Sequence, residues 1–407
     1  MRLARAIVKV PAVVAAACCS ALFSCVSLRQ VAPGEERAIR EAAVSLAAGI
    51  AETGSAERWF AEDGVYQCMM YFAGRDPAFV SEHLRGMRSA ADFQSYTLHT
   101  FGLTGIECGL DMMMAWDAAS HYAYGNPRKP MEEMRTRRFR ISSYPGTARA
   151  DDAGKVGDLA ERALDRLLAA MAPEGDLRGR FESNLNRMSG RAISLILAPD
   201  SRYWDAFNAT ARTTFGAGWD PEKKTTYEIS IGVPYYNSLS CGTLVHEITH
   251  MTDLLCKLAP IEETNPGEIT GENAREKFTA WWADSNAGIF PGDTPLGEGV
   301  AMYMSRRLDV IHAAFFVSPK QNLESARGRR PIRSGILMKT PVAWDRKTRL
   351  LQYEELNSFV EFLVERRGLD EFLRFYMRPP LTEERFASFF GEDYAGAEQE
   401  WRAWLGF

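Results

Sequence analysis

Two periods of hydrophobic positions run along the chain and predict two kinds of element. Apolar residues spaced by three or four indicate helices, and apolar residues at alternate positions indicate short strands. We therefore expect helices over residues 35–50, 108–124, 156–171, a segment near 201–214, and 243–255, and strands over 139–142, 192–197 and 226–233. Strands that alternate with helices and then give way to helices alone predict an α+β fold that is predominantly helical. Residues 128–140, where basic and acidic residues mix, are interpreted as a solvated linker.

The first 24 residues have the order of a bacterial export signal. Arg2, Arg5 and Lys9 precede an apolar stretch over residues 10–23, which ends in small residues. This stretch is too short to cross a membrane in the mature protein, because a spanning helix needs about 20 apolar residues. We interpret residues 1–24 as a signal peptide and expect an exported protein.

The end of this segment, Leu22-Phe23-Ser24-Cys25, resembles the lipobox of bacterial lipoproteins. In a lipobox a small residue precedes a cysteine that is lipidated and becomes the new N-terminus. Phe23 is bulkier than the usual pattern allows, so the match is to a relaxed form of the motif. We expect Cys25 to anchor the protein to a bacterial cell membrane, facing the periplasm or the cell surface. The alternatives are a plain secretory signal, cleaved elsewhere, and an uncleaved anchor.

The composition is that of a folded, mildly acidic protein. The 407 residues are 46% hydrophobic, which supports a buried core and excludes wholesale disorder. The formal net charge is −5 and no long basic block is present, so we expect no nucleic-acid partner. Four cysteines follow the lipobox, and Cys241 and Cys256 bracket an expected helix about 22 Å long, which no disulfide spans. Cys68 with Cys108 is the one pairing we consider.

The sequence His246-Glu247-Ile248-Thr249-His250 matches the pattern H-E-x-x-H. On a helix, residues four apart lie on one face, so both imidazoles can bind one Zn²⁺ while Glu247 lies beside them as a general base. Residues 243–255 contain no proline or glycine, as a helix requires. An apolar stripe can bury this helix, and it consists of Leu244, Ile248, Met251 and Leu255. The alternative is a buried helix whose histidines make ordinary hydrogen bonds.

A catalytic zinc site has a third protein ligand and a fourth position for water. The metzincin pattern requires a glycine at position 253 and a histidine at position 256, and Asp253 and Cys256 exclude it. The other large branch uses a glutamate on a later helix, for which the candidates are Glu268, Glu272, Glu276 and Glu298. We favour Glu298, because Pro295 indicates that a helix begins there, which places Glu298 in the first turn. Glycines flank Glu298 on both sides.

The H-E-x-x-H helix, followed about fifty residues later by Glu298-Gly299-Val300-Ala301-Met302-Tyr303, resembles the peptidase MA-like gluzincin family. The resemblance continues through Tyr353 and residues 358–363, 389–391 and 400–405, which are similar to the closing helices of the family. It implies a zinc metallopeptidase domain over residues 134–407, built from a small sheet, an active-site helix and a helical C-terminal part. Residues 25–133, an N-terminal helical region of unknown role, lie outside it.

The resemblance also suggests roles for residues around the metal. Family members often place a tyrosine or histidine opposite the zinc to stabilise the oxyanion, and Tyr353 is the candidate here, with packing as its alternative role. Some members carry an acidic residue four positions after the glutamate ligand, where this chain has Met302. Asp253 is a candidate substitute that would orient a histidine, and the alternative is a plain surface aspartate.

The implied mechanism is hydrolysis of a peptide bond in a peptide or protein substrate. His246, His250 and Glu298 would hold Zn²⁺, which activates water, and Glu247 would take the proton and pass it to the leaving amine. The rival function is a catalytically inactive lipoprotein that keeps the zinc fold and binds a partner or ligand. Glu247 favours the enzyme, because a fold kept only for structure does not need a base beside the metal.

The lipobox resemblance leads to a test of the anchor. Replacement Cys25→Ser should move the protein from the detergent phase to the aqueous phase, because acyl chains attached to Cys25 would be its membrane tether. Phase partitioning and sequencing of the mature N-terminus measure this. Unchanged partitioning, or a mature N-terminus other than Cys25, would contradict lipidation.

Overall fold

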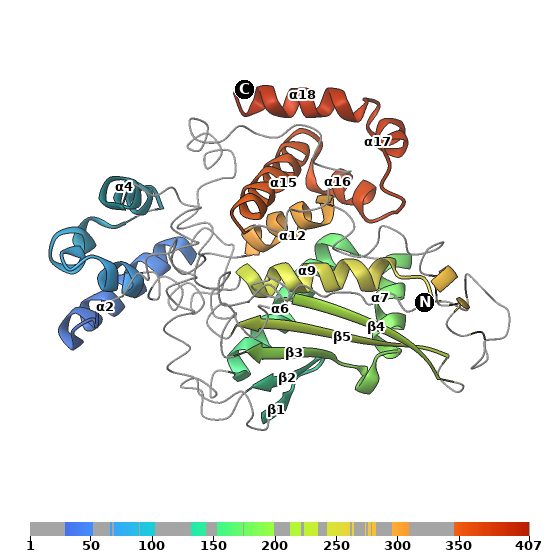
Figure 1. Ribbon diagram of the computed structural model, residues 1–407, viewed down its shortest axis with the longest axis horizontal. Helices are drawn as coiled ribbons and strands as arrows, with labels where there is room; N and C mark the ends of the chain where they lie inside the picture. Colours follow the sequence, from blue (N-terminus) through green and yellow to red (C-terminus); the bar gives the residue numbers. More distant parts are fainter. Residues whose placement is uncertain are drawn as a thin grey trace, which may run out of the picture.

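The computed structural model of the protein contains a mixed sheet, helices packed on it and a helical C-terminal part (Figure 1). It describes residues 29–51, 66, 69–88, 90–101, 132–143, 153–173, 175–198, 212–220, 224–234, 242–260, 263, 273, 276–277, 279–281, 295–308 and 346–406. The signal peptide, Cys25, the helix expected over residues 108–124 and the Cys68 and Cys108 pair lie outside these residues. Among the described helices, none has both the length and the apolar composition that crossing a membrane requires.

The N-terminal region contains helices α2 (Pro33–Ala51) and α4 (Ala90–Phe101), a π-helical turn at Phe79–His83 and a 3-10 turn at Leu84–Gly86. Helix α2 confirms the helix expected over residues 35–50. The buried side chains of this region, such as Ile39 and Phe72, form one hydrophobic cluster, and those of residues 139–405 form another. The metal ligands and the general base expected from the sequence lie in the part of the chain that forms the second cluster.

Five strands form one sheet in the order β1-β2-β3-β5-β4. They are β1 (Glu132–Arg135), β2 (Phe139–Ser143), β3 (Ile193–Ala198), β4 (Arg212–Asp220) and β5 (Lys224–Pro234). The central strands β2, β3 and β5 are parallel, and β1 and β4 pair antiparallel at the two edges. The three central strands confirm the strands expected from alternating apolar residues, and β1 begins two residues before the boundary expected at residue 134.

The prediction of a helix near residues 201–214 is wrong for its last residues. Residues 212–214 belong to β4, which pairs with β5 along its whole length, from Arg212 opposite Gly232 to Asp220 opposite Lys224. Threonine favours strands, and the backbone hydrogen bonds to β5 decide the conformation of a segment whose own pattern is weak. Residues 201–211 lie outside the described part of the chain.

The solvated linker expected over residues 128–140 is also wrong for its described part. Residues 132–135 form β1, and Arg138 is buried with 6% of its surface exposed. Its guanidinium lies 2.8 Å from the Glu161 carboxylate and 2.7 Å from that of Asp165, both on helix α6 (Ala153–Met171). The buried charge of Arg138 is therefore neutralised by a helix that comes later in the chain, which a local charge pattern does not reveal.

Helices α6, α7 (Asp176–Asn186) and α9 (Gly242–Lys257) lie together, and α6 and α9 contact the sheet (Figure 1). The apolar stripe expected on α9 is fully buried at Leu244, Ile248, Met251 and Leu255. Asn184 of α7 caps the end of α9, since its Nδ2 donates to the carbonyl oxygens of Leu255 and Leu258 at 2.8 and 2.9 Å. The last carbonyls of a helix have no partner within it, so this cap fixes the end of α9 against α7.

The C-terminal part is helical, as expected. It contains α12 (Pro295–Leu308), α15 (Arg346–Arg367), α16 (Leu369–Tyr376), α17 (Glu383–Phe390) and α18 (Tyr394–Trp404). Helix α12 contacts α9 on one side and α15 on the other (Figure 1). A sheet with packed helices, followed by helices alone, agrees with the predominantly helical α+β class.

Gly299 allows the close approach of α12 to α15. A Cβ atom built on Gly299 would lie 2.8 Å from the carbonyl oxygen of Leu356 and 3.1 Å from Cγ2 of Val360. Contacts this short require one of the helices to move, because the nearest atom belongs to the backbone. Gly299 follows Glu298 directly, so its small size also sets the position of that carboxylate.

Replacement Gly299→Ala should therefore destabilise the fold by about 1–3 kcal/mol, the usual penalty of overpacking. Gly179→Ala on α7 is the matched control, because no atom lies within 4 Å of its Cβ position and alanine there should stabilise by about 0.4–1 kcal/mol. Chemical denaturation measures both variants. Equal stability of the Gly299→Ala variant and the parent would contradict the close packing of α12 on α15.

Candidate metal centre

Helix α9 presents His246 and His250 on one face, one turn apart. Its apolar stripe packs into the core, and this burial directs the histidines away from the sheet and toward α12. The two imidazole rings lie edge to face with centroids 4.6 Å apart, and their Nε2 atoms are 3.0 Å apart. The helix thus presents two nitrogen donors at one point in space.

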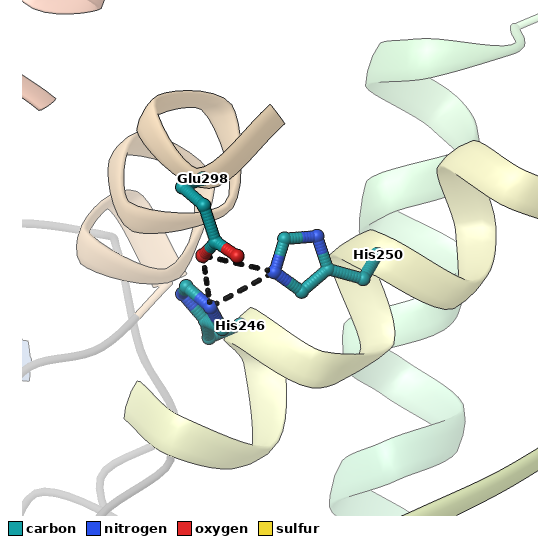
Figure 2. A group of neighbouring side chains, drawn as sticks. All are labelled: His246, His250 and Glu298. Carbon is teal, nitrogen blue, oxygen red and sulfur yellow. Dashed lines mark hydrogen bonds and ion pairs between the residues drawn. The ribbon is translucent and has the colours of Figure 1, made fainter. Parts of the chain in front are cut away.

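Helix α12 supplies the third group. Pro295 is its first residue, and Glu298 follows in the first turn. Proline fits this position, because the first N–H groups of a helix have no partner within the helix and proline lacks this group. Figure 2 shows the Glu298 side chain pointing from α12 toward the two imidazoles of α9. Its Oε2 atom lies 3.2 Å from Nε2 of His246 and 3.3 Å from Nε2 of His250.

The electrostatics of this group follow from its burial. Burial by itself would raise the pKa of the Glu298 carboxyl, but the charge of His250 and the close contacts with both imidazoles hold that pKa well below its ordinary value. Burial by itself would lower the pKa of His250, but the nearby Glu298 carboxylate has the larger effect, so the pKa of His250 is raised. The carboxylate therefore carries its negative charge in this arrangement, and a metal ion would replace the imidazole protons, because histidine binds a metal in its neutral form.

The spacing of the three donor atoms fits a metal ion. Zinc binds histidine nitrogen and carboxylate oxygen in tetrahedral geometry at about 2.0–2.2 Å, which places any two ligand atoms about 3.3–3.6 Å apart. The three observed separations are 3.0, 3.2 and 3.3 Å. Oε2 of Glu298 is buried and satisfied by no conventional hydrogen bond, as expected of an atom whose natural partner is a cation. Within the described part of the chain, this is the one group that could hold a metal ion.

The other candidate glutamates do not join this group where they can be placed. Glu276 is exposed to solvent and outside the cluster. Glu268 and Glu272 lie outside the described residues. The structure thus brings Glu298, the glutamate favoured from the helix start, next to both histidines.

Glu247 lies between the two histidines in sequence and is 7% exposed. Its Oε2 atom accepts a hydrogen bond of 2.6 Å from the hydroxyl of Thr213, which belongs to the edge strand β4. Sequence reasoning missed Thr213, because residues 201–214 were expected to be helical. An alternation of apolar and polar residues around Thr213 would have indicated a strand, but Gly216 and Gly218 interrupt this alternation in β4.

Tyr353 and Asp253 lie near the centre but in different surroundings. Tyr353 on α15 is half-buried, and its ring centroid lies 6.1 Å from that of His246. Asp253 is 4% exposed, so the interpretation as a surface aspartate is wrong. Its carboxylate lies 2.5 Å from Nζ of Lys257 and accepts a hydrogen bond of 2.8 Å from the hydroxyl of Tyr376. The ion pair with Lys257 lies within α9, and the hydrogen bond from Tyr376 ties Asp253 to α16.

Comparisons of the chain with protein families, with curated proteins and with solved structures found no match. The evidence for a metal centre is the H-E-x-x-H pattern together with the geometry of the three side chains.

Replacement His250→Ala should abolish stoichiometric zinc binding, because it removes one of three donors. Elemental analysis after dialysis against zinc should show one zinc per parent chain and much less than one in the variant. The control is His99→Ala, since His99 is an exposed histidine on α4 and should not affect zinc content. Zinc content unchanged in His250→Ala would exclude this metal centre.

Proposed function

We propose that the protein is a zinc-dependent peptidase of the gluzincin type, exported and lipid-anchored through Cys25. The observation that carries this proposal is the convergence of His246, His250 and Glu298 on one point, next to the buried carboxylate of Glu247. Two histidines and a glutamate leave a fourth tetrahedral position for water, which distinguishes catalytic from structural zinc sites.

The chemistry is the addition of water to a peptide carbonyl. A bound zinc ion supplies Lewis acidity, which lowers the pKa of water and polarises the carbonyl oxygen. Glu247 takes a proton from the attacking water as the new carbon–oxygen bond forms, and it delivers that proton to the amine nitrogen as the carbon–nitrogen bond breaks. Its burial supports this role, because a base screened from bulk water exchanges its proton with the substrate.

The position of β4 supports an extended peptide as the substrate. β4 is the last strand in the order of the described sheet, and its residue Thr213 contacts Glu247. An edge strand has backbone N–H and C=O groups that can pair with an added strand, and peptides bind in this way to many proteins. A substrate paired with β4 would extend past the base and the metal ligands.

Replacement Glu247→Gln tests the enzyme against the binding lipoprotein. Glutamine keeps the shape of the side chain but removes the base, so hydrolysis should fall by a factor of about 10²–10⁴, while zinc content and stability stay near those of the parent. The assay is casein or peptide-library cleavage that a chelator abolishes and zinc restores.

The control is Glu228→Gln, because Glu228 is exposed on β5 and its replacement should leave cleavage unchanged. Equal rates for the parent and Glu247→Gln would show that Glu247 is not the base. A zinc-loaded parent that cleaves nothing across the panel would favour the inactive, ligand-binding lipoprotein.

A further inference from the structure

The hydroxyl group of Thr213 lies against the carboxylate of Glu247. Its Oγ1 atom is 2.6 Å from Oε2 of Glu247 and 3.3 Å from the backbone carbonyl oxygen of the same residue. A hydroxyl has one hydrogen to donate, and the shorter distance assigns that hydrogen to the carboxylate. Among the described residues, Thr213 is the hydrogen-bond donor to this carboxylate, and it comes from the sheet and not from α9.

This contact fixes the orientation of a group that would otherwise rotate. The terminal torsion of a glutamate side chain has a broad energy minimum, so its carboxylate plane is poorly defined without an external partner. Threonine is suited to hold it, because its branched Cβ restricts its own first torsion. Thr213 lies opposite Ile231 in the register of β4 and β5, and Ile231 is fully buried. The hydroxyl donor therefore belongs to a strand that is held in place by its pairing with a buried neighbour.

We propose that Thr213 is a positioning residue for Glu247, which holds Oε2 so that Oε1 faces the space beside the metal ligands. This inference rests on the proposed function, since it assigns Glu247 the role of a base. A base held in place before the substrate arrives loses no rotational freedom during the reaction, so the gain appears in the chemical step. A hydroxyl that served only packing would be replaced by a methyl group without loss.

The variants Thr213→Val and Thr213→Ser separate these roles. Valine keeps the branched shape and removes the hydroxyl, and serine keeps the hydroxyl and removes the methyl group. The control is Thr252→Val on α9, whose buried hydroxyl donates to the carbonyl oxygen of Ile248 at 2.7 Å and does not approach Glu247. All variants are prepared as the full chain, loaded with zinc and checked for zinc content.

In peptide hydrolysis, kcat of Thr213→Val should fall about 10–100-fold with KM little changed, the usual effect of losing a partner that orients a group at a metal site. Thr213→Ser should stay close to the parent, and Thr252→Val should equal it. In the Glu247→Gln background, Thr213→Val should cause no additional loss, because no base remains to be positioned. An unchanged kcat in Thr213→Val, or an equal loss in Thr213→Ser, would overturn the proposal.

Binding of acetohydroxamate to the zinc-loaded protein gives a readout that needs no turnover. This ligand binds zinc through oxygen and carries an acidic hydroxyl whose proton a correctly oriented Glu247 accepts. Calorimetry should show affinity about tenfold weaker in Thr213→Val and Glu247→Gln, and parent affinity in Thr213→Ser and Thr252→Val. Parent affinity in Thr213→Val would overturn the positioning role.

The kinetic and the calorimetric measurements together distinguish the failure of this inference from the failure of the proposed function. A parent that cleaves no peptide defeats the proposed function, and the calorimetric comparison of Thr213→Val with Thr213→Ser still decides the positioning role. If Thr213→Val does not fold, Thr213→Ala takes its place as the variant without a hydroxyl, with the same expected losses.

Discussion

The packing of α12 between α9 and α15 is the constraint on which the candidate metal centre depends. The three donor atoms lie within 3.3 Å of one another only because two helices hold them there, and neither helix carries all three. α9 is held by its buried stripe and by the Asn184 cap, and α12 is held by the glycine that admits the backbone of α15. A small displacement of α12 would separate the carboxylate from both imidazoles.

Burial makes this geometry chemically useful. A carboxylate in a region of low dielectric attracts a cation more strongly than one in water, and Glu298 keeps its charge because the imidazoles oppose the effect of desolvation. One turn beyond His250, α9 carries a second buried polar group, in which Asp253 meets Lys257 and Tyr376. The hydrogen bond from Tyr376 ties α9 to α16, and the ion pair with Lys257 lies within α9. The two neighbouring clusters also influence each other, since the charge of Asp253 contributes to raising the pKa of His250.

The sequence predicted what is local and missed what depends on distant pairing. The helical period and the H-E-x-x-H spacing identify α9 and its histidine face, and Pro295 marks the start of α12. The strand β4 has no clear alternation and forms by pairing with β5, so Thr213 and its contact with Glu247 could not be anticipated. Arg138 was placed in a linker because its partner on α6 comes later in the chain. The 3.0–3.3 Å spacing of the three donors required the packing of whole helices.

Anomalous diffraction at the zinc edge, measured on crystals grown with zinc, locates a bound metal without reference to activity. One strong peak is expected about 2.0–2.2 Å from Nε2 of His246, Nε2 of His250 and a carboxylate oxygen of Glu298. A crystal in which these three side chains keep their positions while no peak lies between them, or while zinc binds elsewhere on the chain, would contradict the metal centre.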